Sequence, residues 1–177
     1  MNFETYCNTI PTFAVYPDAN QNTPAAMSYL ILKLCGETGE LYTASKSHNA
    51  IDIISELGDV LWYIGMLINT LNCDVKTIVD IANNTTHGPN PLTTNIFLLT
   101  CSIAEYYGKI LRNDGSLTPK DFQWLTQKLG KLLYYVRMMC YQHVKYDSLG
   151  FEFVLNYNLG KLTGRKQEHT LKSRNKS

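Results

Sequence analysis

Four carboxylates stand in this chain as two pairs, each pair three residues apart: Glu37 and Glu40 in GETGEL, then Glu56 and Asp59 in SELGDVLWY. Residues three apart on a helix share a face, so two antiparallel helices could bring all four acids together. Carboxylates that close repel one another and take up protons unless cations neutralise them. The spacing therefore points to a divalent-metal site. The alternative is two acid pairs on solvated helix faces that never meet.

The residues around the second pair favour the metal site. Apolar residues recur at helical spacing from Ile51 to Leu71, so a charge at Asp59 would be poorly solvated. Gly36, Gly39 and Gly58 lie beside the acids. Glycine inside a helix costs about 1 kcal/mol relative to alanine, so its repeated use indicates space kept for close packing or for a ligand.

The elements that must position these acids are predicted to be helices almost throughout. Thr23 can cap a helix that begins at Pro24, because the first helical position needs no N–H donor. The run THGPNPLT has the composition of a linker. The expected elements are an irregular arm to about residue 23 with a short helix near 3–8, and helices over about 24–46, 50–72 and 74–84.

After the linker the sequence begins again. SIAEYYGK aligns with ETGELYTA and QKLGKLLYYVRMM with SELGDVLWYIGML, which places Glu105 on Glu40 and Gly130 on Gly58. The alignment predicts an internal duplication, with chance similarity between amphipathic helices as the alternative. The predicted organisation is an acid-bearing half, a linker, and a second half that ends in a basic tail: 1–84, 85–92 and 93–177.

The second half lacks most of the acids. Only Glu105 remains, and the other three positions become Ser102, Lys128 and Lys131. This half should therefore bind no divalent cation. We expect its two lysines to pair with Glu105 instead.

Composition restricts the class of protein further. With 177 residues, 45% apolar content and a net charge of +1, the chain should be globular, with no overall signal for nucleic acid or membranes. Five cysteines without a CxxC motif favour reduced thiols over disulfides or zinc. We expect a soluble intracellular protein. Six Lys/Arg and one Glu from Lys161 onward form a basic tail without the interleaved aromatics of a nucleic-acid site.

GETGEL with Lys46 downstream, followed by SELGDVLWY, resembles the MazG-type branch of the all-α nucleoside triphosphate pyrophosphohydrolases, relatives of the dimeric dUTPases. TFAVYP near the start and NYNLGKLTGRK near the end are similar to the arm and tail of phage-borne and bacterial members. The resemblance implies an all-α fold. It also implies that tandem helical bundles form a pseudo-dimer within one chain, in place of the family's dimer, and it leaves further homodimerisation open.

The resemblance also implies a reaction: hydrolysis of a ribo- or deoxyribonucleoside triphosphate to the monophosphate and pyrophosphate, with Mg²⁺, or alternatively Mn²⁺, as cofactor. The implied location is the cytoplasm, that of the host if the gene is phage-encoded. The implied metal ligands and catalytic acids are Glu37, Glu40, Glu56 and Asp59. The implied substrate contacts are Lys46, Lys161 and Arg165 for phosphate, and Asn158 with its equivalent Asn83. Trp62, Tyr63 and Tyr42 are candidates to stack on the base, with a place in the apolar core as the alternative.

A different class of function stays open. Because a fold does not fix an activity, the chain could be a weak or inactive enzyme that acts as a nucleotide-sensing or partner-binding module. The complete set of four acids argues against that reading. Neither the preferred base nor the sugar can be read from the sequence.

Overall fold

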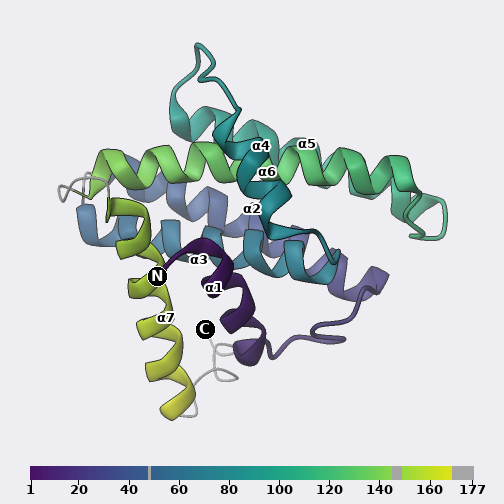
Figure 1. Ribbon diagram of the computed structural model, residues 1–177, viewed down its shortest axis with the longest axis horizontal. Helices are drawn as coiled ribbons and strands as arrows, with labels where there is room; N and C mark the ends of the chain where they lie inside the picture. The colour runs from purple at the N-terminus through teal and green to yellow at the C-terminus, as the bar shows by residue number, and fades with distance from the viewer. Residues whose placement is uncertain (48, 145–148, 169–177) are drawn as a thin grey trace.

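The structure is a computed structural model that describes residues 1–47, 49–144 and 149–168 (Figure 1). Within these residues there is no strand, and the predicted all-α class is confirmed. The predicted turn at 47–49 includes His48, which lies outside the described residues. The elements in chain order are α1 (Phe3–Thr9), the 3-10 helix η1 (Ile10–Phe13), α2 (Pro24–Ser47), α3 (Ala50–Thr70), α4 (Val75–Asn83), α5 (Leu92–Arg112), α6 (Pro119–His143) and α7 (Gly150–Gln167).

The helix start that the sequence predicts at Thr23 and Pro24 is confirmed, and a second long helix begins at a cap of its own. The Thr23 hydroxyl accepts a hydrogen bond from the Ala26 N–H at 3.2 Å, and Pro24 takes the first helical position of α2. Thr118 and Asp121 form a capping box at the start of α6. Each cap satisfies N–H groups that have no partner within the helix, so these short polar signals fix where the long helices begin.

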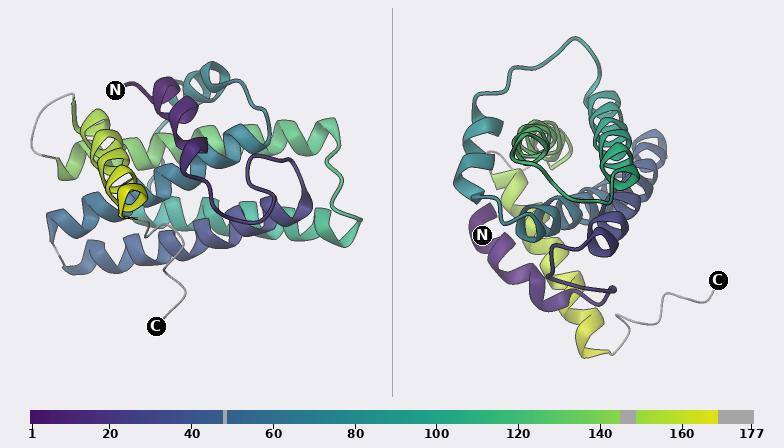
Figure 2. Two further views of the ribbon diagram at one scale, coloured as in Figure 1. Left: turned by 90° about the horizontal axis from the view of Figure 1, so that it is seen from below. Right: turned by 90° about the vertical axis from the view of Figure 1, so that its right-hand side faces the viewer.

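The four long helices form one bundle built from two hairpins, α2–α3 and α5–α6 (Figures 1 and 2). α2 packs on α5, and α3 packs on α6. A short helix crosses each hairpin steeply: α7 lies on α3, and α4 lies on α6. α4 follows α3 along the chain but packs on α6, and α7 follows α6 but packs mainly on α3. Buried apolar side chains from every helix join in one core. The internal duplication stays a prediction.

The two crossings are close because glycine lies at each contact. A Cβ atom at Gly58 would lie 2.8 Å from the Asn158 Cβ, and one at Gly130 would lie 2.5 Å from the Ile81 Cγ2. Both distances are shorter than a side chain tolerates. By contrast, a Cβ at Gly36 or Gly39 would meet nothing within 4 Å, so of the three glycines beside the acids close packing explains only Gly58.

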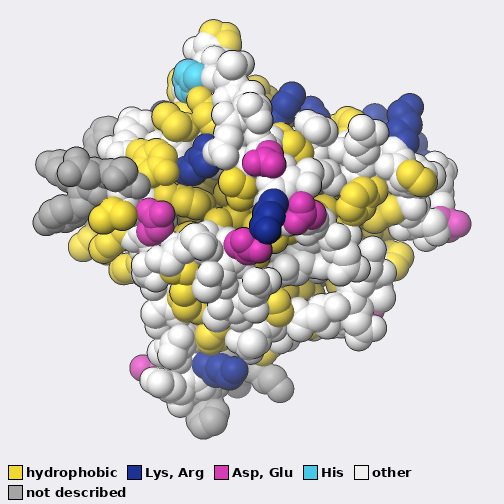
Figure 3. Space-filling model, viewed as in Figure 1, with side chains coloured by type: hydrophobic (Ala, Val, Ile, Leu, Met, Phe, Trp, Pro, Cys, Tyr) yellow, Lys and Arg dark blue, Asp and Glu magenta, His cyan; other side chains and the backbone are white. Residues whose placement is uncertain are grey.

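The linker between α4 and α5 arches over α6, as the end-on view in Figure 2 shows. The Gly88 N–H donates to the Tyr135 hydroxyl at 3.3 Å and ties the linker to α6. Figure 3 shows the face that carries α4, on which basic and acidic side chains are interspersed among apolar and neutral ones. That face has no large area of one charge.

Candidate active site

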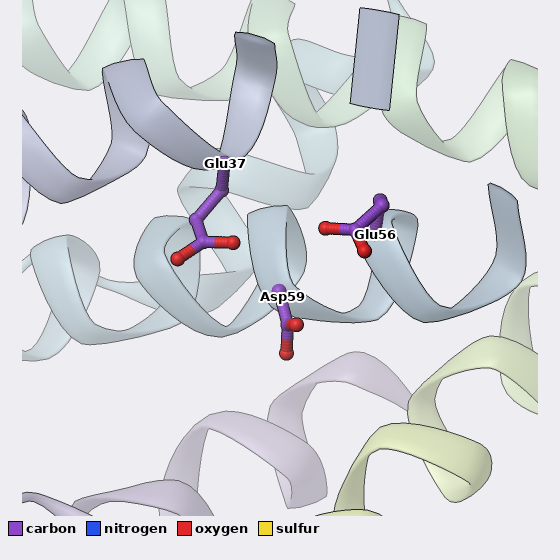
Figure 4. Close-up of side chains that lie close together, drawn as sticks. All are labelled: Glu37, Glu56 and Asp59. Atoms are coloured by element: carbon purple, nitrogen blue, oxygen red, sulfur yellow. The ribbon is translucent and has the colours of Figure 1, made fainter. Parts of the chain in front are cut away.

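Three of the predicted carboxylates converge between α2 and α3. Oxygen atoms of Glu37, Glu56 and Asp59 all lie within 4.8 Å of one another. Figure 4 shows Glu37 reaching from α2 toward α3, which carries the other two acids. Glu40 is exposed on the next turn of α2 and lies outside this group. The antiparallel hairpin thus brings together one member of the first pair and both members of the second.

The protein environment makes this carboxylate group difficult to ionise fully. Burial, and then the charge of Asp59, raises the pKa of Glu37, while Lys33 at 3.1 Å partly offsets this. Burial raises the pKa of Glu56 to about 7, helped by the charges of Asp59 and Glu40. One Glu56 oxygen, Oε2, is buried without a hydrogen-bond partner. A buried acceptor without a donor, among acids that repel one another, is the environment that a bound cation would stabilise.

α7 supplies the direct partners of Asp59. The Lys161 Nζ lies 2.7 Å from both Asp59 carboxylate oxygens and donates to the Ser55 hydroxyl at 3.1 Å. The Asn158 amide donates to Asp59 at 3.1 Å. The Tyr6 hydroxyl donates to the Asn158 carbonyl oxygen at 2.7 Å and so fixes the orientation of that amide. Burial holds the pKa of Tyr6 well above its usual value, which keeps the hydroxyl a donor.

An aromatic pocket of about 310 Å³ opens beside the carboxylates. Trp62 and Arg165, both predicted to contact substrate, line it together with Glu37 and Asp59. Trp62 is 8% exposed, and its indole Nε1 has no hydrogen-bond partner. Lys33 also lines the pocket. The other lining residues are apolar or aromatic: Phe13, Val15, Tyr16, Tyr29, Tyr63 and Leu162. The pocket therefore offers flat apolar surfaces and cations close to the acids.

Two predicted substrate contacts lie elsewhere. Lys46 is exposed at the end of α2, where its ammonium lies 5.0 Å from the centre of the Tyr42 ring. Asn83 ends α4 and accepts a hydrogen bond from Arg137 of α6 at 2.8 Å. Neither residue lines the pocket or belongs to the carboxylate group. This geometry does not support a role for either residue at the acids.

The expected ion pairs of the second half are wrong. Glu105 pairs instead with Lys109, one turn along α5, at 3.1 Å. Lys128 lies over the Trp124 ring at 5.0 Å from its centre. Among the described residues, neither Lys128 nor Lys131 forms an ion pair. The side chain of Glu105 is exposed, and its ion-pair partner lies on the same helix.

Sequence reasoning missed several residues of the site. Lys33 precedes Glu37 by four positions, which is the helical spacing of an ion pair, so a spacing search could have found it. Tyr29 lies four residues before Lys33 on the same helix and stacks on Tyr16 with ring centres 4.8 Å apart. Tyr16 itself belongs to the irregular arm, where no periodicity indicates which side chains turn inward.

The fold and the site together define an all-α protein with an acidic, metal-compatible group beside an aromatic pocket. The model of the MazG nucleotide pyrophosphohydrolase domain matches residues 26–85, which run from α2 through α4 and include all three converging acids. The Gene 37 protein of Mycobacterium phage L5 is 30% identical over 90 residues, or 44% of this chain and 79% of that protein. The chain belongs to the MazG nucleotide pyrophosphohydrolase family.

The family match ends before α5, so the second hairpin and α7 lie outside it. No solved structure matches the chain significantly. None of the described helices combines the length and the apolar character that a membrane span requires.

Proposed function

We propose that this protein hydrolyses a nucleoside triphosphate between its α and β phosphates, releasing a nucleoside monophosphate and pyrophosphate, with Mg²⁺ as cofactor and Mn²⁺ as an alternative. The observation that carries the proposal is the convergence of Glu37, Glu56 and Asp59 within 4.8 Å, next to an aromatic pocket. This combination offers a place for phosphate-bound cations and a place for a base, side by side.

The residues present fit a magnesium ion. Carboxylate oxygens are the protein ligands that Mg²⁺ prefers, and the ion usually shares its remaining positions with water and substrate phosphates. Glu37, Glu56 and Asp59 would hold it, with the exposed Glu40 next to them. Once bound, the ion would neutralise phosphate charge and lower the pKa of an attacking water. As a metal ligand, Glu56 would first have to lose the proton that its pKa of about 7 lets it keep in the metal-free protein.

The pocket would take the nucleoside. Its volume of about 310 Å³ is at the lower end of the range for small-molecule sites, which suits a base and sugar whose phosphates extend toward the acids. Tyr16 and Tyr29 offer stacked rings, and the unpartnered indole N–H of Trp62 would donate to an acceptor on the base. Neither contact selects ribose over deoxyribose.

Cations at the border between pocket and acids would bind the phosphates. Lys33 and Arg165 line the pocket, and Lys161 lies against Asp59. Arginine can bind a phosphate through two parallel hydrogen bonds, and lysine acts as a mobile point charge. Lys161 now neutralises Asp59, and its ammonium is placed to contact a phosphate that approaches the same carboxylate.

One chain would suffice for this activity, because α7 brings to α3 the contacts that a second protomer would otherwise supply. Further homodimerisation is not required. We also propose that the protein acts in the cytoplasm, where thiols stay reduced and nucleoside triphosphates occur.

The test is pyrophosphate release from a panel of ribo- and deoxyribonucleoside triphosphates, measured with Mg²⁺, with Mn²⁺ and with EDTA. We expect release that depends on the metal and is lost in Asp59→Asn. Asp52→Asn is the matched control, since Asp52 is an exposed acid in the first turn of the same helix. Nucleotide binding without release from any member of the panel would instead identify a nucleotide-sensing module.

A further inference from the structure

A second pocket lies on the other hairpin, where α4 crosses α6. Its volume is about 540 Å³, within the range of small-molecule sites. It shares no lining residue with the aromatic pocket beside the acids. The polar residues that line it include Thr77, Asp80, Asn84, Gln127, Lys131 and Tyr135.

The two pockets have the same construction. Asp59 and Tyr63, four residues apart on α3, line the first pocket, and Lys131 and Tyr135, four apart on α6, line the second. Each pocket lies beside a steep helix crossing that depends on a glycine. At the first position of this pair, a carboxylate in one pocket corresponds to an ammonium in the other.

Several polar side chains of the second pocket have unused hydrogen-bonding capacity. Within the described part of the chain, Lys131 forms no ion pair, and the side chains of Gln127 and Asp80 have no hydrogen-bond partner. The Asn84 amide donates to the Asp80 backbone carbonyl at 2.8 Å, which leaves its own oxygen as an acceptor. One cation, one acid and two amides therefore face a cavity with bonding capacity to spare.

The wall of the pocket is held in place. Tyr135 accepts a hydrogen bond from the Gly88 N–H at 3.3 Å, and the His87 ring lies 5.9 Å from the Tyr135 ring, centre to centre. These contacts fasten the linker over α6. The aromatic ring of Tyr135 is 8% exposed and forms a flat side of the pocket.

We propose that this second pocket binds a nucleoside monophosphate without a metal ion. Lys131 would contact the phosphate, Asp80 would accept hydrogen bonds from sugar hydroxyls, and the amides of Gln127 and Asn84 would bind the edge of the base. A triphosphate is disfavoured, because a single ammonium opposes its charge and Asp80 repels it. A nucleic acid is also disfavoured, since the surrounding face in Figure 3 has no continuous basic area.

This inference goes beyond the proposed hydrolysis, although the two connect chemically. A nucleoside monophosphate is a product of that reaction, so the pocket would let the protein sense its own product. Binding there needs no turnover and no cation. The two proposals can therefore fail independently.

The test is titration calorimetry of the full chain in EDTA with AMP, GMP, CMP and UMP, combined with hydrogen exchange to locate the site. We expect one monophosphate per chain and slower exchange over 77–86 and 127–135. Lys131→Glu should weaken binding by about tenfold or more, as expected for loss of a charge-assisted hydrogen bond. Lys120→Glu makes the same charge change at an exposed position near the start of α6 and should leave binding unchanged.

Other results would overturn the proposal. Failure of every monophosphate to bind in EDTA would contradict it. Protection from hydrogen exchange confined to residues 29–37 and 56–63 would also contradict it, because those residues surround the first pocket. Equal competition by inorganic phosphate would show that the nucleoside is not recognised. Because Lys131 is exposed, both Lys131→Glu and Lys131→Gln should fold, and unchanged affinity in the two variants would count against the site.

Discussion

The two hairpins of this bundle share a frame and differ in charge. At the four positions that carry Glu37, Glu40, Glu56 and Asp59 in the first hairpin, the predicted alignment places Ser102, Glu105, Lys128 and Lys131 in the second. The formal charge of the set changes from −4 to +1, the latter from two lysines and one glutamate. The core needs apolar positions and glycine at the crossings, and both hairpins keep these. The polar positions differ, and the converging acids lie in the first hairpin.

Among the described residues, the two carboxyl groups whose pKa is raised, Glu37 and Glu56, lie in the first hairpin. Its acids are partly buried, and Glu56 is pushed to a pKa of about 7. In the second hairpin, Glu105 and Lys109 form an exposed pair of a kind that contributes only about 0–1 kcal/mol to folding. The repulsion among these acids is what a cation bound between them would relieve.

The sharpest test of this contrast is an equivalent pair of substitutions, one in each hairpin. Glu56→Gln should reduce turnover by about 100-fold or more, since a metal ion contributes several kcal/mol to transition-state stabilisation. Lys128→Gln, at the aligned position of α6, should leave turnover unchanged. Steady-state pyrophosphate release and calorimetric uptake of Mg²⁺ would measure both. Equal losses in the two variants would contradict the assignment of the site to the first hairpin.

The two glycine crossings give the next largest effect. Gly58→Ala and Gly130→Ala should each lower the free energy of unfolding by up to about 2 kcal/mol, because overpacking outweighs the helix propensity that alanine gains. Only Gly58→Ala should also reduce turnover, by about tenfold, because the added methyl displaces Asn158 and with it the support of Asp59. Thermal unfolding and turnover, measured on the same preparations, separate the two effects. Unchanged turnover in a folded Gly58→Ala protein would show that α7 does not position the acids.

The pKa of Glu56 predicts how pH acts on the first hairpin. Mg²⁺ must displace a proton from Glu56, so metal affinity should rise with pH through about 7. The charge of Lys161 lowers the pKa of Glu56, so Lys161→Met should move this midpoint to higher pH. Lys166→Met, at an exposed residue next to Arg165 on α7, is the control and should not move the midpoint. Calorimetric titrations with Mg²⁺ from pH 5.5 to 8.5 on all three proteins would measure the shift.

The same group gives a stability prediction with a definite sign. The pKa of Glu56 is about 7 in the folded state against an ordinary 4.5, so between these values the folded state holds a proton that the unfolded state has lost. Its contribution to the stability of the metal-free protein is therefore full below about pH 4.5 and lost as the pH rises to about 7. Urea unfolding in EDTA at pH 5 and pH 8 should show a smaller difference for Glu56→Gln than for the wild type.

The smallest effect concerns the base. Trp62→Phe removes the unpartnered indole N–H and should raise KM by about three- to tenfold, with little change in kcat, as expected for one neutral hydrogen bond. Tyr134→Phe, at the aligned position of α6, should leave KM unchanged. Comparing the two variants across the nucleotide panel would also show which base accepts that hydrogen bond. If Trp62→Phe leaves the KM of every nucleotide at its wild-type value, the indole N–H does not contact the base.

The sequence predicts the long helices well because their signals are local. The cap at Thr23, the capping pair at Thr118 and the apolar spacing of α3 each act within one or two helical turns. The convergence of Glu37 on Glu56 and Asp59 follows from the same spacing, once two helices form a hairpin.

The rest of the site depends on long-range packing, which single-sequence periodicity does not report. Asn158 and Lys161 lie on one face of α7, but their contact with Asp59 is set by how α7 crosses α3. Tyr16 comes from an arm without periodicity. Glu40 shows the opposite failure, because sharing a helix face with Glu37 did not bring its carboxylate into the group.

The pairing of Lys161 with Asp59 joins residues 102 positions apart in the chain. On the ribosome, the acids therefore emerge long before the helix that orders them. A nascent chain would hold its carboxylates without the lysine and asparagine that orient them until α7 has been synthesised and has docked. Docking of α7 on α3 would thus follow synthesis of the acids and would complete the contacts of Asp59.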